Sequence, residues 1–206
     1  MSIFQKIFSY LGIGLFIFLL ARIGIFAVHY ENFSSLTFVE VLQGFFYGLR
    51  FDLASLLVFS GIPLLLMALP FRWCTSQWWH VALSILVFFV LVLEGTLLIG
   101  DVIYFGYVKR HLTNELLFLG KDIKYLVSEA AANPGYLTIW FGMFFFGLFY
   151  WLRLSKVKVR TGHFHWPKFI LFFVFVVITG RGGIGMKPLA IVHAYSSGSS
   201  SLGNLI

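Results

Sequence analysis

The sequence predicts an all-α integral membrane protein, a bundle of five transmembrane helices with an amphipathic interfacial helix between the third and fourth spans. Two observations lead to this prediction. Only 11% of the 206 residues are charged and 60% are hydrophobic, whereas a soluble domain carries roughly 25% charged residues. The apolar residues also gather in five runs separated by short polar segments. A bilayer therefore suits most of the exterior of this chain better than water does.

The five predicted spans cover about residues 7–28, 38–69, 78–107, 136–152 and 166–180, and they place one transmembrane domain over residues 1–180. The first run is about 22 residues long and ends without a small-residue cleavage site, so we interpret it as a retained span rather than a signal peptide. The second and third runs exceed the roughly 20 residues of a straight span. We expect the second to begin as an interfacial or tilted segment and to stop at Pro70.

The polar stretch from Lys109 to Asn133 has a helical pattern of its own. Apolar residues recur there at spacings of three and four: Leu112, Leu116, Leu119, Ile123 and Leu126. This spacing predicts an amphipathic helix that lies on the membrane surface.

The distribution of basic residues predicts the orientation. The segment 153–168 holds five Lys or Arg residues and no acidic residue, and Lys6 and Arg72 fall on the same side if the spans alternate. By the positive-inside rule the N-terminus is cytoplasmic and the C-terminus extracytoplasmic. Membrane topology therefore accounts for the net charge of +7, and no nucleic-acid partner is expected.

The stretch 181–206 is rich in Gly and Ser and has no long apolar run. Such a composition is typical of a linker. We expect it to be an extracytoplasmic linker towards a further domain that is absent from this chain.

No complete catalytic or metal site is recognisable. Phosphate-loop, nucleophile-elbow and H-E-x-x-H patterns are missing. His163 and His165 have no carboxylate or thiol nearby to complete a metal site. Cys74 is the single cysteine, which rules out an internal disulfide, and we expect it to be structural.

Charged residues inside the predicted spans are the most informative feature, because each is costly in lipid. At 1.5 Å per residue, four of them lie roughly 22–25 Å from the cytoplasmic end of their spans. The candidate set consists of Arg22, Asp52, Glu94 and Arg181 in this layer, with Arg50 and Asp101 close to it. Three interpretations stay open: interhelical ion pairs that fix packing, a pocket for an anionic lipid headgroup, and a proton or ion pathway.

Three segments also resemble one protein family. Gly48-Leu49-Arg50-Phe51-Asp52-Leu53 resembles the G-x-R-F-D-L signature in the membrane part of lipoteichoic acid synthases and phosphoglycerol transferases. Asp101-Val102-Ile103-Tyr104-Phe105, followed by Lys109-Arg110, resembles the D-x-x-Y-F stretch of that family. Arg181-Gly182-Gly183, followed by Lys187-Pro188-Leu189 and Ala194, resembles the segment that leads out of the fifth span. Their order and spacing agree with the family over almost the whole chain.

The resemblance implies a function for a longer parent protein in a bacterial cytoplasmic membrane. Family members carry a sulfatase-like extracytoplasmic domain that transfers glycerol phosphate from phosphatidylglycerol by means of a threonine nucleophile and a divalent metal, manganese or magnesium. None of that machinery lies in this chain, so no catalytic residue and no cofactor is assigned to it. The expected role is to anchor the enzyme and to present phosphatidylglycerol. A small transporter or lipid-translocating protein and a non-catalytic anchor are the alternatives, and the oligomeric state is left open.

Overall fold

The computed structural model describes residues 2–71, 74, 76–109, 128, 131–132, 134–156, 166–182, 194 and 200–205. The helices in this part of the chain are α1 (Ile3–Val28), α2 (Tyr30–Phe33), α3 (Phe38–Met67), α4 (Gln77–Val108), α6 (Pro134–Lys156), α7 (Trp166–Gly180) and α9 (Ser200–Leu205). No strand occurs among these residues. The predicted all-α class is therefore confirmed.

Four of the described helices, α1, α3, α4 and α6, are long and apolar enough to cross a membrane. This length and composition make the chain a multi-pass membrane protein. Helix α7 is equally apolar but has only 15 residues, which cover about 22 Å against a hydrocarbon core of about 30 Å. The interfacial helix predicted for residues 109–133 falls almost entirely outside the described residues.

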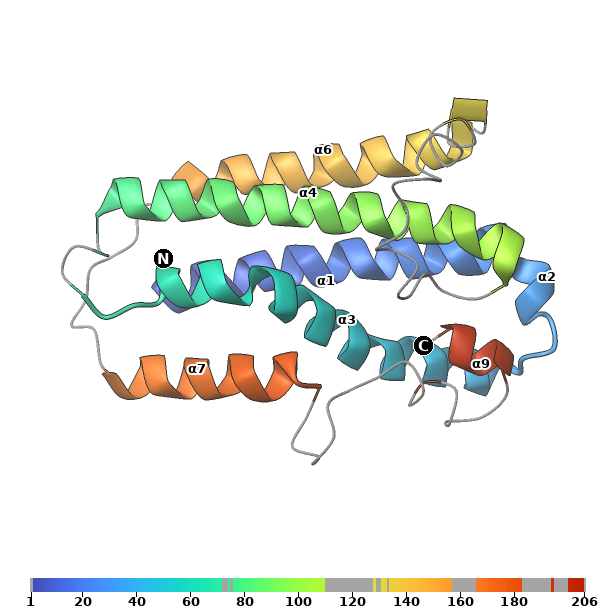
Figure 1. Cartoon of the computed structure of the whole chain (residues 1–206), viewed down its shortest axis with the longest axis horizontal. Coiled ribbons are helices and arrows are strands. Elements are labelled where there is room, and N and C mark those ends of the chain that lie inside the picture. Colours follow the sequence, from blue (N-terminus) through green and yellow to red (C-terminus); the bar gives the residue numbers. More distant parts are fainter. Residues whose placement is uncertain are drawn as a thin grey trace.

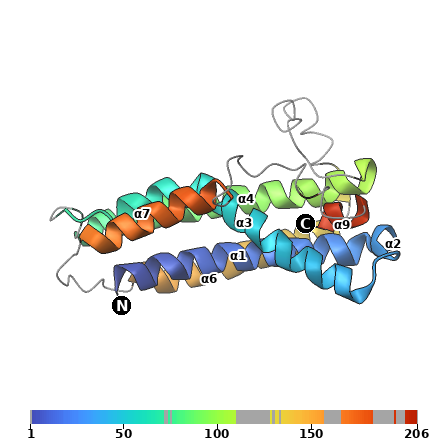
Figure 2. The same cartoon turned by 90° about the horizontal axis from the view of Figure 1, so that it is seen from below.

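The helices run along a common direction, with α1, α3 and α4 packed against one another (Figure 1). Helix α6 covers α4 and α1, and α7 lies along the half of α3 that ends at Met67 (Figures 1 and 2). The N-terminus lies at one end of the bundle and α9 at the other, where it rests on α3 and α2 (Figure 1). We call these the N-terminal end and the α9 end.

Helix boundaries differ from the predicted spans for local reasons. Helix α1 begins four residues before the predicted 7, because Ser2 and Gln5 form a reciprocal capping box. Helix α3 starts at Phe38 with a second capping box, in which Thr37 is the cap and Glu40 reaches back to it. The side chains of these caps satisfy free backbone amides of the first turn. They therefore fix the start of each helix directly after a polar cap residue.

The long second run is one continuous helix rather than two. Figure 1 shows that α3 bends part-way along its length. Pro63 lies inside the helix and removes one backbone donor. Ser60 adds to the disturbance, because its hydroxyl donates to the carbonyl of Leu56.

Candidate functional site

An ion pair between α1 and α3 joins two members of the predicted charge layer. Nη2 of Arg22 is 2.5 Å from Oδ1 of Asp52, and both side chains are 11% exposed. Gly48 lies one helical turn before Asp52 on α3. A Cβ at position 48 would come within 2.0 Å of Nη1 of Arg22, so the missing side chain makes the space in which the guanidinium packs.

Helix α9 covers this ion pair and supplies a further hydrogen-bond acceptor to Arg22. Nη1 of Arg22 donates to the carbonyl of Leu205. The Leu205 side chain is 1% exposed and packs over Gly44, where a Cβ would lie 2.8 Å from it. Nδ2 of Asn204 donates to the carbonyl of Lys109 at 3.0 Å, which joins α9 to the end of α4. The Arg22–Asp52 pair is thus enclosed by three helices.

Arg50 occupies a different environment, at the junction of α3 and α7. Its Nε donates to the carbonyl of Gly182 at 2.6 Å, and its Nη2 donates to the same oxygen. The residue itself is exposed, as is Arg181, which precedes Gly182 in the turn that follows α7. Two exposed arginines from segments 131 positions apart therefore lie at one junction, with Gly182 between them.

Glu94 is buried and isolated in the described part of the chain. It is 3% exposed, and neither of its carboxylate oxygens has a hydrogen-bond partner there. Asp101, two turns further along α4, is half-buried. The structure thus brings Arg22 to Asp52 and Arg50 to the turn beside Arg181, whereas Glu94 joins neither contact.

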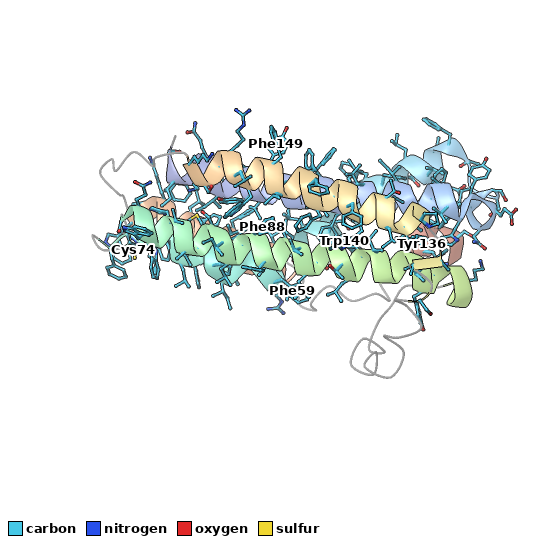
Figure 3. The ribbon with its side chains drawn as sticks, turned by 90° about the horizontal axis from the view of Figure 1, so that it is seen from above. Phe59, Cys74, Phe88, Tyr136, Trp140 and Phe149 are labelled. Atoms are coloured by element: carbon cyan, nitrogen blue, oxygen red, sulfur yellow. The ribbon has the colours of Figure 1, made fainter. Side chains whose placement is uncertain are left out.

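The seam between α4 and α6 is aromatic and apolar. Figure 3 shows Phe88 and Trp140 between these two helices. Trp140 stacks on Phe144, with 5.3 Å between ring centroids, and Phe88 contacts the ring of Trp151 at 5.1 Å. A crevice beside these rings, open between α1, α4 and α6, is lined by apolar residues that include Ile17 and Gly147. It carries no charged group and does not fit a phosphate.

No group of three metal-ligating side chains occurs among the described residues. His163 and His165 lie outside them. Within the described part, the chemistry that the arrangement supports best is recognition of an anion by exposed guanidinium donors.

The glycines and the backbone carbonyls that surround the arginines were not anticipated from the sequence. Gly44, Gly48 and Asp52 follow one another at four-residue intervals, which places them on one face of α3. This spacing is a signal that would have indicated a close approach of Arg22. The carbonyls of Gly182 and Leu205 carry no sequence signal, because any residue type supplies a carbonyl.

Fold and site together define a helical multi-pass membrane protein with a buried ion pair and an exposed arginine junction. Comparisons of the chain with protein-family models, with curated proteins and with solved structures find no match.

Proposed function

We propose that this chain is the membrane domain of a phosphoglycerol transferase-like enzyme of the lipoteichoic acid synthase family. In this role it anchors the enzyme and holds phosphatidylglycerol for an extracytoplasmic catalytic domain. The proposal is supported by the segments that carry the family resemblance. Arg50 of the first segment donates to Gly182 of the third, so residues far apart in sequence meet at one place.

The observation that carries the proposal is the exposed guanidinium of Arg50. Two of its nitrogens are held by one carbonyl, which fixes the plane of the group. Its Nη1 makes no hydrogen bond within the described residues, so donors are left for a ligand. A phosphodiester is a strong acceptor for an oriented arginine, and a second arginine, Arg181, lies next in the chain to Gly182. Phosphatidylglycerol presents an anionic phosphodiester of this kind.

The proposal includes a five-span architecture. Helix α7 is taken as a short fifth span that ends beside α3, where a Cβ at Gly180 would lie 3.8 Å from the Cβ of Leu57. The remaining half of α3 then extends towards the extracytoplasmic surface, together with an interfacial helix over 109–133. Exposed Arg153, Lys156 and Lys168 gather at the N-terminal end, which favours a cytoplasmic location for that end in a bacterial inner membrane.

In this proposal, catalysis belongs to a separate extracytoplasmic domain of the parent enzyme. That domain would supply the threonine nucleophile and a manganese or magnesium ion. Holding the lipid close to a tethered active site raises its effective concentration. The coding sequence after residue 206 tests this part directly: an α/β domain with metal-ligand acids supports it, and a stop codon favours a non-catalytic anchor.

Activity of the full-length parent tests the role of Arg50. We expect Arg50→Gln to reduce kcat/KM for a fluorescent phosphatidylglycerol by about tenfold, because one charge-assisted contact of roughly 1.5 kcal/mol is lost. Arg153→Gln is the matched control, since Arg153 is exposed at the other end of the bundle, over the ring of Phe149. Unchanged turnover in well-folded Arg50→Gln protein would refute lipid presentation by this residue.

A transporter is the second candidate, and the isolated carboxyl of Glu94 is the observation that favours it. Buried ionisable groups in spans often mark ion pathways. Purified protein in liposomes distinguishes the two functions. If the wild type moves protons or lipid across the bilayer and Glu94→Gln does not, transport is supported. If the wild type moves neither, the membrane-domain proposal stands.

A further inference from the structure

A second polar cluster lies at the N-terminal end, remote from the arginines. It consists of Lys6 and Tyr10 on α1 and of His80 and Ser84 on α4, each pair separated by one helical turn. All four residues are buried, with exposed fractions of 1%, 1%, 3% and 0% respectively. Polar side chains buried to this extent normally have hydrogen-bond partners.

The cluster satisfies only part of its own polar groups. Oγ of Ser84 donates to the carbonyl of His80 at 2.5 Å, and Nε1 of Trp151 donates to the carbonyl of Ser84 at 2.7 Å. Oη of Tyr10 lies beside Ser84 but outside hydrogen-bond geometry, and Nδ1 of His80 has no partner in the described part. Two buried polar atoms are thus left over next to a lysine that interacts electrostatically with His80.

No acidic side chain among the described residues pairs with Lys6. All eight acidic residues lie between Glu31 and Glu129 in the sequence. The described segments that meet at the N-terminal end therefore hold none. The nearest acid along α4 is Glu94, 14 residues beyond His80, or about 21 Å along the helix. Burying an ammonium group without a counter-charge is costly.

We infer that Lys6, Tyr10 and His80 form a binding site for a phosphate-type oxyanion at the N-terminal end of the bundle. The anion supplies the missing counter-charge to Lys6 and accepts hydrogen bonds from the Tyr10 hydroxyl and from His80 in the tautomer protonated on Nδ1. Lys6 lies in the first turn and a half of α1, and His80 in the first turn of α4, so the site is close to the membrane surface. Its ligand is the phosphate of a lipid headgroup or free inorganic phosphate.

Thermal unfolding of the purified chain tests the site. In detergent, inorganic phosphate is titrated against gluconate at matched ionic strength. In nanodiscs, phosphatidic acid is compared with phosphatidylcholine alone. At a ligand concentration about tenfold above Kd, we expect Tm of the wild type to rise by roughly 3–6 °C. A rise with phosphate identifies a free anion as sufficient, and a rise only with phosphatidic acid identifies the headgroup.

Variants show whether the response belongs to this site. Lys6→Met keeps the length of the side chain and removes the charge, so we expect it to abolish the rise. Tyr10→Phe removes one hydroxyl and keeps the ring, and we expect it to reduce the rise even if Lys6→Met does not fold. Lys156→Met, at an exposed lysine of the same end, is expected to respond like the wild type.

Two results would overturn the inference. One is a wild-type Tm that responds to neither phosphate nor phosphatidic acid, which would show that Lys6 is buried in its neutral form. The other is a ligand-induced rise in Tm that is as large in Lys6→Met and in Tyr10→Phe as in the wild type. Arg50 plays no part in this site. Refuting the phosphate site would therefore leave the proposed function, which rests on Arg50, unaffected.

Discussion

Gly48 and the guanidinium of Arg22 occupy adjoining space so closely that a β-carbon at position 48 would lie 2.0 Å from Nη1 of Arg22. The guanidinium is the end of a long side chain, but it has little freedom to move away. Asp52 holds its Nη2 and the Leu205 carbonyl holds its Nη1. A glycine on α3 is therefore part of the ion pair between α1 and α3.

This relationship predicts the effect of a single methyl group. We expect Gly48→Ala to lower the free energy of unfolding by about 1–3 kcal/mol, because the added carbon displaces the guanidinium from Asp52. Gly24→Ala is the matched control, since nothing lies within 4 Å of a Cβ at that position on α1. It should be neutral or stabilising by up to roughly 1 kcal/mol. Equal effects of the two substitutions on Tm would contradict the packing described here.

The ion pair itself predicts strong coupling. Asp52→Asn leaves a buried guanidinium without its counter-charge, which we expect to cost about 3–5 kcal/mol. The double variant Arg22→Met with Asp52→Leu removes both charges and should recover most of that loss. A double-mutant cycle, measured by denaturant unfolding in detergent, gives the coupling energy. Additive effects would show that the two side chains do not depend on each other.

Replacement of Glu94 is expected to stabilise the protein, unlike replacement of Asp52. Its carboxyl group is buried without a hydrogen-bond partner in the described residues, so its removal takes away a desolvation penalty. We expect Glu94→Leu to raise the free energy of unfolding by roughly 1–3 kcal/mol. Thermal unfolding checks this directly. A lowered Tm would mean that Glu94 has a partner that stabilises it.

Cys74 predicts slow thiol chemistry. Burial raises the pKa of this thiol above its ordinary value, and the residue is 1% exposed. The reactive thiolate is therefore scarcer at neutral pH than in an exposed cysteine, and its fraction increases only as the pH rises through the raised pKa. We expect maleimide to label the folded protein slowly at pH 7 and quickly after denaturation in SDS. Equally fast labelling of the folded form would contradict a buried thiol.

The sequence was sufficient to predict the all-α class, with helices long and apolar enough to cross a membrane, and one contact of the site. Helical rise sets depth, so counting residues placed Arg22 and Asp52 at similar levels, and they form an ion pair. Depth does not set the direction in which a side chain points. Glu94 was estimated at the same level, yet it meets neither residue of the pair in a hydrogen bond.

Other features depend on tertiary contacts that leave no periodic pattern. Helix α9 has six residues, too few for an apolar repeat to be recognised, and its position depends on Leu205 filling the space over Gly44. The cluster around Lys6 was missed for a related reason. A lysine at the start of a span normally reaches water, and only the packing of α4 against α1 shows that this one is buried.

The most direct test of the central claim is the lipid content of the purified chain. Protein extracted in native nanodiscs is analysed by mass spectrometry, and the ratio of phosphatidylglycerol to phosphatidylethanolamine is compared with that of the source membrane. We predict enrichment of phosphatidylglycerol in the wild type and in Arg153→Gln, and a loss of about tenfold in its relative affinity in Arg50→Gln. A lipid ratio in Arg50→Gln equal to that of the wild type would contradict a headgroup site at the junction of α3 and α7.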